Sequence, residues 1–393
     1  MPICYSAPMI KRVILLVVDG LGVGATEDAS EYGDAATHTL GHLAESAGGL
    51  SLPTLESLGL GHVTAIRGVR SMAQPIGCFG RLAFKSKGVD SLVGYGEIAG
   101  CVTQDEGPRF AEGYSAEAQA ALSEVFGHKI LGGKVASAVE ALQEFGPSHL
   151  SGGGPVVWTD GRQTCHVAAH EQVWTADVLY QRCREARKAL KETWGIRRVV
   201  AHPVVGSSAA LRFGAGRRDF AGEPPGPTML DVLNRASQIL IGVGKVGDLF
   251  AGRGLTRSAL AYHWTDVLDE IRGMFNKVPR GLIFAGLDVI ASNAGASAAA
   301  IQDFDRRLPE LLDQLRPGDL FIVTGDHGRD PGKPHGLATR EFVPLIVTGP
   351  KLAQGVNLGV RSTAADLGQT IVEGLKGESL TIGDSFLDVL RPG

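Results

Sequence analysis

Three short apolar runs, each ending close to an aspartate, constrain the fold of this 393-residue chain more than any other feature. The runs are rich in Val, Ile, Leu and Phe and span 13–18, 282–287 and 320–324. Continuous apolar runs of this length are typical of parallel strands that are buried on both faces. Helical patterns lie between them, and strands that alternate with helices favour an α/β fold with a mostly parallel sheet. The predicted helices span 39–45, 296–315 and 363–373.

The middle of the chain has a different pattern. Its helical stretches are separated by short strands and glycine-rich turns, and it ends in a loop rich in Gly, Arg and Pro. We therefore predict an α+β domain at 103–225, inserted into a core formed by 1–102 and 226–393. The predicted helices span 116–126, 134–145 and 175–194, the strands 155–158 and 199–201, and the loop 212–227.

The three strand runs lead to Asp19, Asp288 and Asp326, and His327 follows the last of these acids. In open α/β sheets, ligands bind at the carboxyl ends of the strands. Three acids and an imidazole gathered there would repel one another unless a cation lay between them, and this donor set suits Mn²⁺, Mg²⁺ or Zn²⁺. A single strand-end aspartate would favour the alternative of a helix cap. The complete set favours a metal site.

A metal site for group transfer requires a nucleophile, and Ser91 in the segment KGVDSLVGYGE is the candidate. Metal coordination lowers the pKa of a hydroxyl and makes it nucleophilic near neutral pH. The alternative is a turn or cap serine. The loop DGLGVG after the first strand lacks the full GxGxxG spacing, and Asp19 stands where a phosphate would approach, so a dinucleotide site is disfavoured.

Composition restricts the class of partner and the compartment. The formal net charge is −4, so no basic excess is available to neutralise a nucleic-acid backbone. Five cysteines without CxxC spacing favour a reducing cytoplasm over a disulfide framework. The first residues lack the apolar core of a signal peptide, and no run approaches the ~20 apolar residues of a membrane span. We expect a cytoplasmic protein that binds neither nucleic acid nor membrane.

Several segments resemble bacterial phosphopentomutases, which belong to the alkaline-phosphatase superfamily. The segments extend over nearly the whole chain and include VVDGLGVGATEDAS, GVGKVGDLFAGRGLT, DHGRDP and TREFVPLIV. The resemblance implies an alkaline-phosphatase-like core with an inserted cap domain. It also implies exchange of a phosphoryl group between C1 and C5 of ribose or deoxyribose. The reaction would pass through a phosphorylated enzyme hydroxyl and a sugar bisphosphate, with two Mn²⁺ ions. For this chain we expect one or two divalent ions, with Mn²⁺ as the expected metal.

The resemblance also implies roles for individual residues around a first ion. Ser91 stands where the family has its threonine nucleophile, and serine supports the same chemistry. The ligands of the first ion would be Asp19, Asp326 and His327, with Ser91 as the fourth.

The residues expected around a second ion depart from the family pattern. Asp288 is kept, but Asn293 and Ala338 stand where the family has histidines. Asn293 would be a poorer ligand than imidazole. His335 is a candidate replacement for the histidine missing at Ala338, and the alternative is an ordinary loop histidine.

The substrate residues are similarly altered. Arg217 keeps a cap arginine of the family, whereas His202 stands where the family has another arginine. Arg162 could replace the lost phosphate contact, or it could be a solvated surface arginine. Lys245, in the segment GVGKVGDLF, is also predicted to bind the phosphorylated sugar.

We therefore expect a phosphopentomutase-like enzyme that acts on a small phosphorylated sugar. The first alternative is a diverged phosphatase or phosphotransferase that acts on a sugar or nucleoside monophosphate. The second is a non-catalytic binding protein that keeps the fold.

Overall fold

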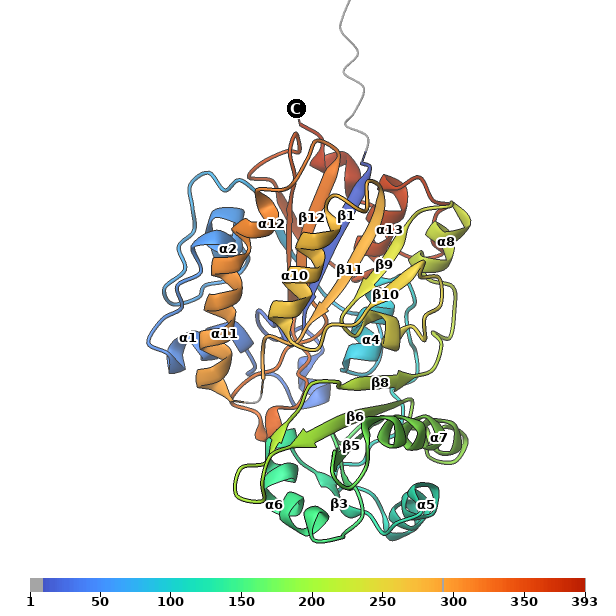
Figure 1. Cartoon of the computed structure of the whole chain (residues 1–393). Helices are drawn as coiled ribbons and strands as arrows, with labels where there is room; N and C mark the ends of the chain where they lie inside the picture. Colours follow the sequence, from blue (N-terminus) through green and yellow to red (C-terminus); the bar gives the residue numbers. More distant parts are fainter. Residues whose placement is uncertain (1–9, 292, 393) are drawn as a thin grey trace, which may run out of the picture. The chain divides into compact units, whose positions relative to one another are not determined.

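The computed structural model describes residues 10–291 and 293–392, and the chain divides into two compact units (Figure 1). The first unit takes Met1–Asp105, Pro224–Gly247 and Gly252–Gly393. The second takes Glu106–Glu223 and the short segment Asp248–Ala251, which the domain limits drawn from the sequence leave in the core. Each unit has its own sheet and its own apolar core.

The first unit is built on an eight-stranded sheet, ordered β10-β9-β11-β1-β12-β13-β2-β14. Only β13 runs antiparallel to its neighbours, so the predicted α/β class with a mostly parallel sheet is confirmed. The strands are β1 (Arg12–Val18), β2 (Cys78–Leu82), β9 (Leu240–Val243), β10 (Arg257–Ala259), β11 (Gly281–Leu287), β12 (Asp319–Gly325), β13 (Val343–Thr348) and β14 (Asn357–Arg361).

The central strands β11, β1 and β12 are buried along their whole length, as the three apolar runs predict. Arg12 is the buried cation among them, and its guanidinium pairs with Asp319 at 2.6 Å. The register aligns Val18 with both Leu287 and Gly325. Because all three strands run parallel, the residues that follow them emerge at one edge of the sheet.

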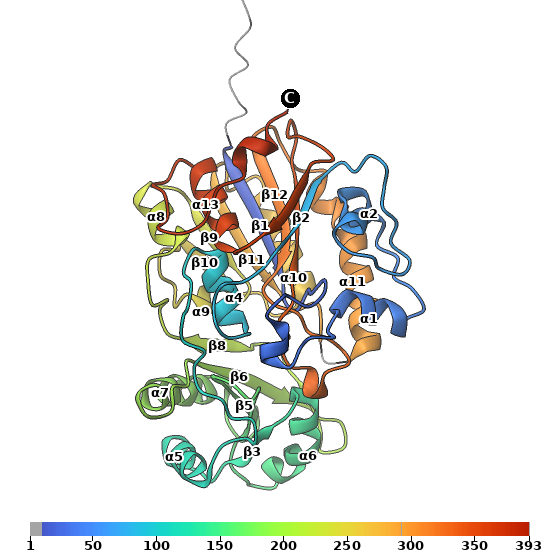
Figure 2. The same ribbon diagram turned by 180° about the vertical axis from the view of Figure 1, so that it is seen from behind.

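Helices cover both faces of this sheet. Helices α1, α2, α10, α11 and α12 lie on the face seen in Figure 1, and α4, α8 and α13 lie on the face seen in Figure 2. The predicted helix at 296–315 is interrupted because Pro309 lacks the backbone donor that would continue it. The helices of this unit are α1 (Thr39–Ser46), α2 (Pro53–Leu58), α3 (Leu60–Val63), α4 (Ser91–Ile98), α8 (Met229–Arg235), α10 (Trp264–Met274), α11 (Ala294–Arg307), α12 (Pro309–Leu312) and α13 (Ala365–Gly374).

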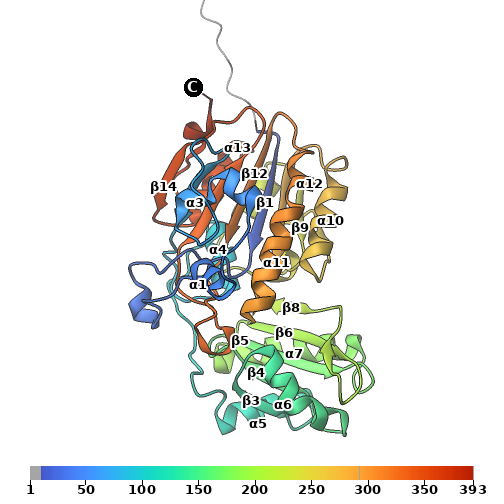
Figure 3. The ribbon, with the colours of Figure 1, turned by 90° about the vertical axis from the view of Figure 1, so that its left-hand side faces the viewer.

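The second unit is a six-stranded sheet in which β3-β4-β5-β6-β7 form a path and β8 also pairs with β6. Helices α5 and α7 pack on one face and α6 on the other (Figure 3). Two sequence predictions were wrong here: the helix expected from 134 begins at Ala138, and the loop expected at 212–227 contains β7 and β8. The elements are β3 (Leu131–Val135), β4 (Val156–Thr159), β5 (Thr164–His170), β6 (Arg198–Val205), β7 (Arg212–Phe213), β8 (Arg218–Ala221), α5 (Ala116–Phe126), α6 (Ala138–Leu150) and α7 (Ala176–Trp194).

Two further observations concern the chain as a whole. Among the helices of the described residues, none combines the length and the hydropathy that crossing a bilayer requires. Cys78, Cys101, Cys165 and Cys183 are buried free thiols, and Cys4 lies outside the described residues.

Candidate metal centre

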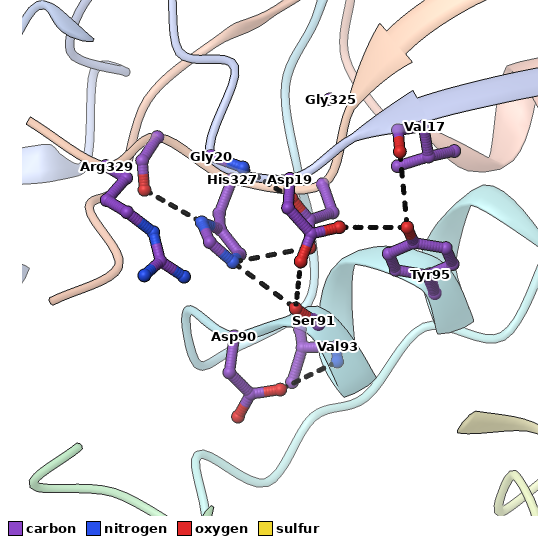
Figure 4. A network of polar contacts seen from close by, with 12 residues as sticks. Val17, Asp19, Gly20, Asp90, Ser91, Val93, Tyr95, Gly325, His327 and Arg329 are labelled. Atoms are coloured by element: carbon purple, nitrogen blue, oxygen red, sulfur yellow. Dashed lines mark hydrogen bonds and ion pairs between the residues drawn. The ribbon is translucent and has the colours of Figure 1, made fainter. Parts of the chain in front are cut away.

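Asp19, Asp326 and His327 form a compact group of ligand atoms at the carboxyl edge of the central strands. Figure 4 shows Asp19 and His327 side by side in this group. Asp19 directly follows β1, and the other two residues follow β12. One ligand atom from each residue lies within 4.8 Å of the other two, and all three side chains are buried. The group therefore offers two carboxylate oxygens and one imidazole nitrogen to a single ion, which is a donor set suited to Mn²⁺ or Zn²⁺.

The imidazole of His327 is arranged as a neutral ligand. Its Nδ1–H donates to the carbonyl oxygen of Gly328 at 2.8 Å, which leaves the Nε2 lone pair directed at the group. Nε2 lies 3.3 Å from Asp326 Oδ2 and 3.5 Å from Ser91 Oγ. Burial lowers the pKa of His327, because the charged form loses its hydration. The neutral tautomer is the one that a metal ion requires.

Asp326 supplies the test of whether a cation fits here. Its Oδ1 accepts a hydrogen bond from the backbone N–H of Gly20 at 3.0 Å. Its Oδ2 is buried and has no hydrogen-bond donor within residues 10–291 and 293–392. A carboxylate oxygen buried without a hydrogen-bond donor is costly, and a bound cation would satisfy it. The residues present therefore fit one divalent ion.

Ser91 is the first residue of α4 and points its hydroxyl at this group. Its Oγ lies 3.2 Å from Asp19 Oδ2. The N-cap of this helix is Asp90, whose side chain accepts a hydrogen bond from the N–H of Val93. Ser91 is therefore not the cap residue. A Cβ at Gly94 would lie 2.2 Å from the carbonyl oxygen of Asp326, so glycine lets α4 approach the centre.

Tyr95 contacts the centre and was not predicted as a site residue. Its hydroxyl lies 2.9 Å from Asp19 Oδ1, and its ring is fully buried and stacked on Phe284. A Cβ at Gly286 would lie 2.5 Å from the Tyr95 hydroxyl, so this glycine leaves the space that the phenol needs. The sequence held one signal: Tyr95 lies four residues after Ser91, and this spacing places both side chains on one face of a helix.

Lys245, predicted as a substrate residue, lies among the acids of the centre. Its ammonium forms an ion pair with Asp19 Oδ2 and lies 3.1 Å from Asp288 Oδ1 and 3.4 Å from Ser91 Oγ. Only 8 % of the residue is exposed.

The residues expected around a second ion are not part of the compact group. Asp288 is exposed and pairs with Lys245. Asn293 is exposed and caps α11, where its Oδ1 accepts from the N–H of Ala296 at 2.8 Å. His335 is exposed in the short 3₁₀ turn η2 (Pro334–Gly336) and has a positive φ of 58°.

The other predicted substrate residues lie in the second unit. His202 is on β6, where its Nε2 lies 3.0 Å from His166 Nδ1 and its ring lies beside Trp158. Arg217 forms an ion pair with Asp219 at 3.3 Å. Arg162 lies in the turn between β4 and β5.

Comparisons with known proteins give consistent results. A family model described as the metalloenzyme superfamily matches residues 11–209 and 291–378. A protein named phosphopentomutase from Caldanaerobacter subterraneus subsp. tengcongensis is 39% identical over 385 residues, covering 96% of this chain and 98% of its own. One of the same name from Syntrophotalea carbinolica is 40% identical over 387 residues, covering 97% of this chain and 98% of its own.

Proposed function

Because this chain belongs to the phosphopentomutase family within the metalloenzyme superfamily, we propose that it moves a phosphoryl group between C1 and C5 of ribose or deoxyribose. The observation that carries the proposal is the position of Ser91 Oγ, 3.2 Å from Asp19 Oδ2 and 3.5 Å from His327 Nε2. A hydroxyl placed against a buried ligand group is the arrangement required of a metal-activated nucleophile.

The chain's own residues support a phosphoserine route. Asp19, Asp326 and His327 would hold a divalent cation, with Mn²⁺ as our proposal. When bound, this ion would lower the pKa of the Ser91 hydroxyl and neutralise charge on the phosphoryl oxygens. Ser91 also lies at the N-terminus of α4, where the helix dipole favours a negatively charged phosphoryl group.

The reaction follows from a phosphorylated Ser91. The phosphoserine passes its phosphoryl group to the free hydroxyl of a pentose monophosphate and gives a pentose bisphosphate. Ser91 Oγ then takes back the phosphoryl group from the other position, so the monophosphate leaves as its isomer. A sugar bisphosphate would serve as the primer that first phosphorylates the enzyme.

For the second unit, we propose that Arg217, Arg162 and His202 bind the phosphorylated sugar. A guanidinium fork matches phosphate oxygens in pairs, which supports the two arginines. The formal net charge of −4 supports a small-molecule partner rather than a nucleic acid. We infer a cytoplasmic location from the cysteine usage.

The test is conversion of ribose 5-phosphate to ribose 1-phosphate with Mn²⁺ and a sugar bisphosphate primer. Ser91→Ala should reduce turnover by roughly 1,000-fold or more, because it removes the covalent acceptor. Ser46→Ala is the matched control, since Ser46 is exposed and its hydroxyl only donates to the carbonyl oxygen of Leu43. Wild-type turnover in Ser91→Ala, or no phosphoserine at Ser91 by mass spectrometry, would reject this route.

A second candidate, hydrolysis of a sugar or nucleoside monophosphate, is favoured by the departures at Asn293 and Ala338. Release of inorganic phosphate without the isomeric sugar phosphate would identify it. A chain that retains no divalent ion and turns over neither substrate would instead indicate a binding protein.

A further inference from the structure

The ammonium of Lys245 lies where it can act on two acids and on the nucleophile at once. It pairs with Asp19 and lies 3.1 Å from Asp288 Oδ1 and 3.4 Å from Ser91 Oγ. Lys245 follows β9, the strand beside β11, so the sheet fixes the position of its backbone. Only 8 % of Lys245 is exposed, so its ammonium lies in the centre rather than in solvent.

The side chains expected to hold a second ion do not fit one. Asn293 Oδ1 is already used as the cap of α11, and Ala338 carries no ligand atom. Within the described residues, the ligand group around Asp19 contains neither Asp288 nor His335. Asp288 instead neutralises Lys245.

Charge balance points the same way. Asp19, Asp288 and Asp326 carry three formal negative charges, and one divalent ion together with the Lys245 ammonium carries three positive charges. A second divalent ion between Asp19 and Asp288 would have to displace an ammonium that already contacts both acids. The repulsion between that ion and the ammonium would be felt at Asp19 and Lys245, which are buried.

We propose that Lys245 takes the place of a second metal ion, so that each chain holds one divalent ion and Lys245 is a catalytic residue. The inference rests on the proposed role of Ser91 as phosphoryl carrier, but not on the identity of the sugar. When the phosphoserine discharges, the sugar hydroxyl oxygen bonds to phosphorus and the bond between phosphorus and Ser91 Oγ breaks. The bonding pair goes to Oγ, and the proton of the sugar hydroxyl restores the serine hydroxyl. The ammonium stabilises the charge that develops on Oγ.

The first test counts ions and needs no sugar. The full chain is stripped with a chelator, equilibrated with Mn²⁺, and its bound metal is measured by elemental analysis. We expect one tightly bound Mn²⁺ per chain. Two Mn²⁺ ions of similar affinity would overturn the inference. One Mn²⁺ without conversion of ribose 5-phosphate would retain it and reject the proposed substrate.

The second test uses Lys245→Met, with Lys277→Met as the matched control because Lys277 is exposed. Lys245→Met should still bind one Mn²⁺ through Asp19, Asp326 and His327. Discharge of its phosphoserine to ribose 5-phosphate should slow by about 100-fold to 1,000-fold, as when one donor to a developing oxyanion is removed. Discharge at the wild-type rate would overturn the catalytic role. If the variant does not fold, the ion count on the wild-type chain still decides the single-ion claim.

Discussion

Replacing Tyr95 with phenylalanine tests how the centre holds Asp19. The variant removes only the hydroxyl that lies 2.9 Å from Asp19 Oδ1 and leaves the ring stacked on Phe284. A hydrogen bond to a charged group contributes about 1.5–3 kcal/mol, and each ~1.4 kcal/mol is a tenfold change in an equilibrium constant. Because the phenol orients a carboxylate that would bind the ion, we expect Tyr95→Phe to weaken Mn²⁺ binding by about 10-fold to 100-fold.

Calorimetric titration of Mn²⁺ into the chelator-stripped protein gives the affinity directly. Tyr180→Phe is the matched control, because the Tyr180 hydroxyl donates to the carbonyl oxygen of Gly216 in the second unit. It should leave the Mn²⁺ affinity unchanged. Equal affinities for the wild type and Tyr95→Phe, with the fold of the variant intact by circular dichroism, would refute the idea that Tyr95 positions Asp19.

Two further predictions concern the same sheet edge and the second unit. In Gly286→Ala the added Cβ would lie 2.5 Å from the Tyr95 hydroxyl and 3.2 Å from Lys245 Cγ. It should lower the free energy of unfolding by about 1–3 kcal/mol and weaken Mn²⁺ binding, and an unchanged thermal midpoint with unchanged affinity would contradict this. Burial lowers the pKa of His149 below 6.5 in the folded protein, so the unfolded chain takes up the proton more readily. This contribution to stability is complete above pH 6.5 and is lost as the pH falls toward the folded pKa. Urea unfolding of the full chain should show less stability at pH 5.5 than at pH 7.5 and a smaller difference in His149→Gln, whereas an equal difference would exclude His149 as the cause.

The three central strands could be predicted from the sequence because their signal is local, whereas β2, β9, β10, β13 and β14 of the same sheet were not predicted. Strands β1, β11 and β12 are buried on both faces, so nearly every residue in them is apolar. Parallel strands also bring their carboxyl ends to one edge, so Asp19 and Asp326 follow from the pattern without any knowledge of packing. The strand β8 was missed because its sequence, RDFA, carries no such apolar run.

The contacts made by Tyr95 and Lys245 could not be predicted, because they join residues far apart in the sequence. The Tyr95 hydroxyl and Asp19 are 76 positions apart, and Lys245 and Ser91 are 154 positions apart. An acid at this edge can pair with an ammonium or with a metal ion. The outcome depends on which side chains extend from neighbouring strands to the acid. No periodicity in the sequence encodes that distance.

The segment TREFVPLIV illustrates what a family motif transfers from one chain to another. Arg340 donates to the carbonyl oxygens of Ser86 and Gly88, on the segment that leads to Ser91. Glu341 accepts from the backbone N–H and the hydroxyl of Thr39, and its side chain is buried. The motif therefore holds the loops around the centre in place.

Membership of a family and identity of mechanism consequently rest on different residues. A motif whose side chains bind loops indicates that the scaffold is kept, and it carries no information about the number of bound ions. We propose that the number of ions depends instead on a few positions outside those motifs, among them Asn293 and Ala338. A chain can thus be 39% identical to a protein named phosphopentomutase and still lack a ligand atom where a second ion is expected, as at Ala338. An ion count is for this reason a sharper test of mechanism in this family than further sequence similarity.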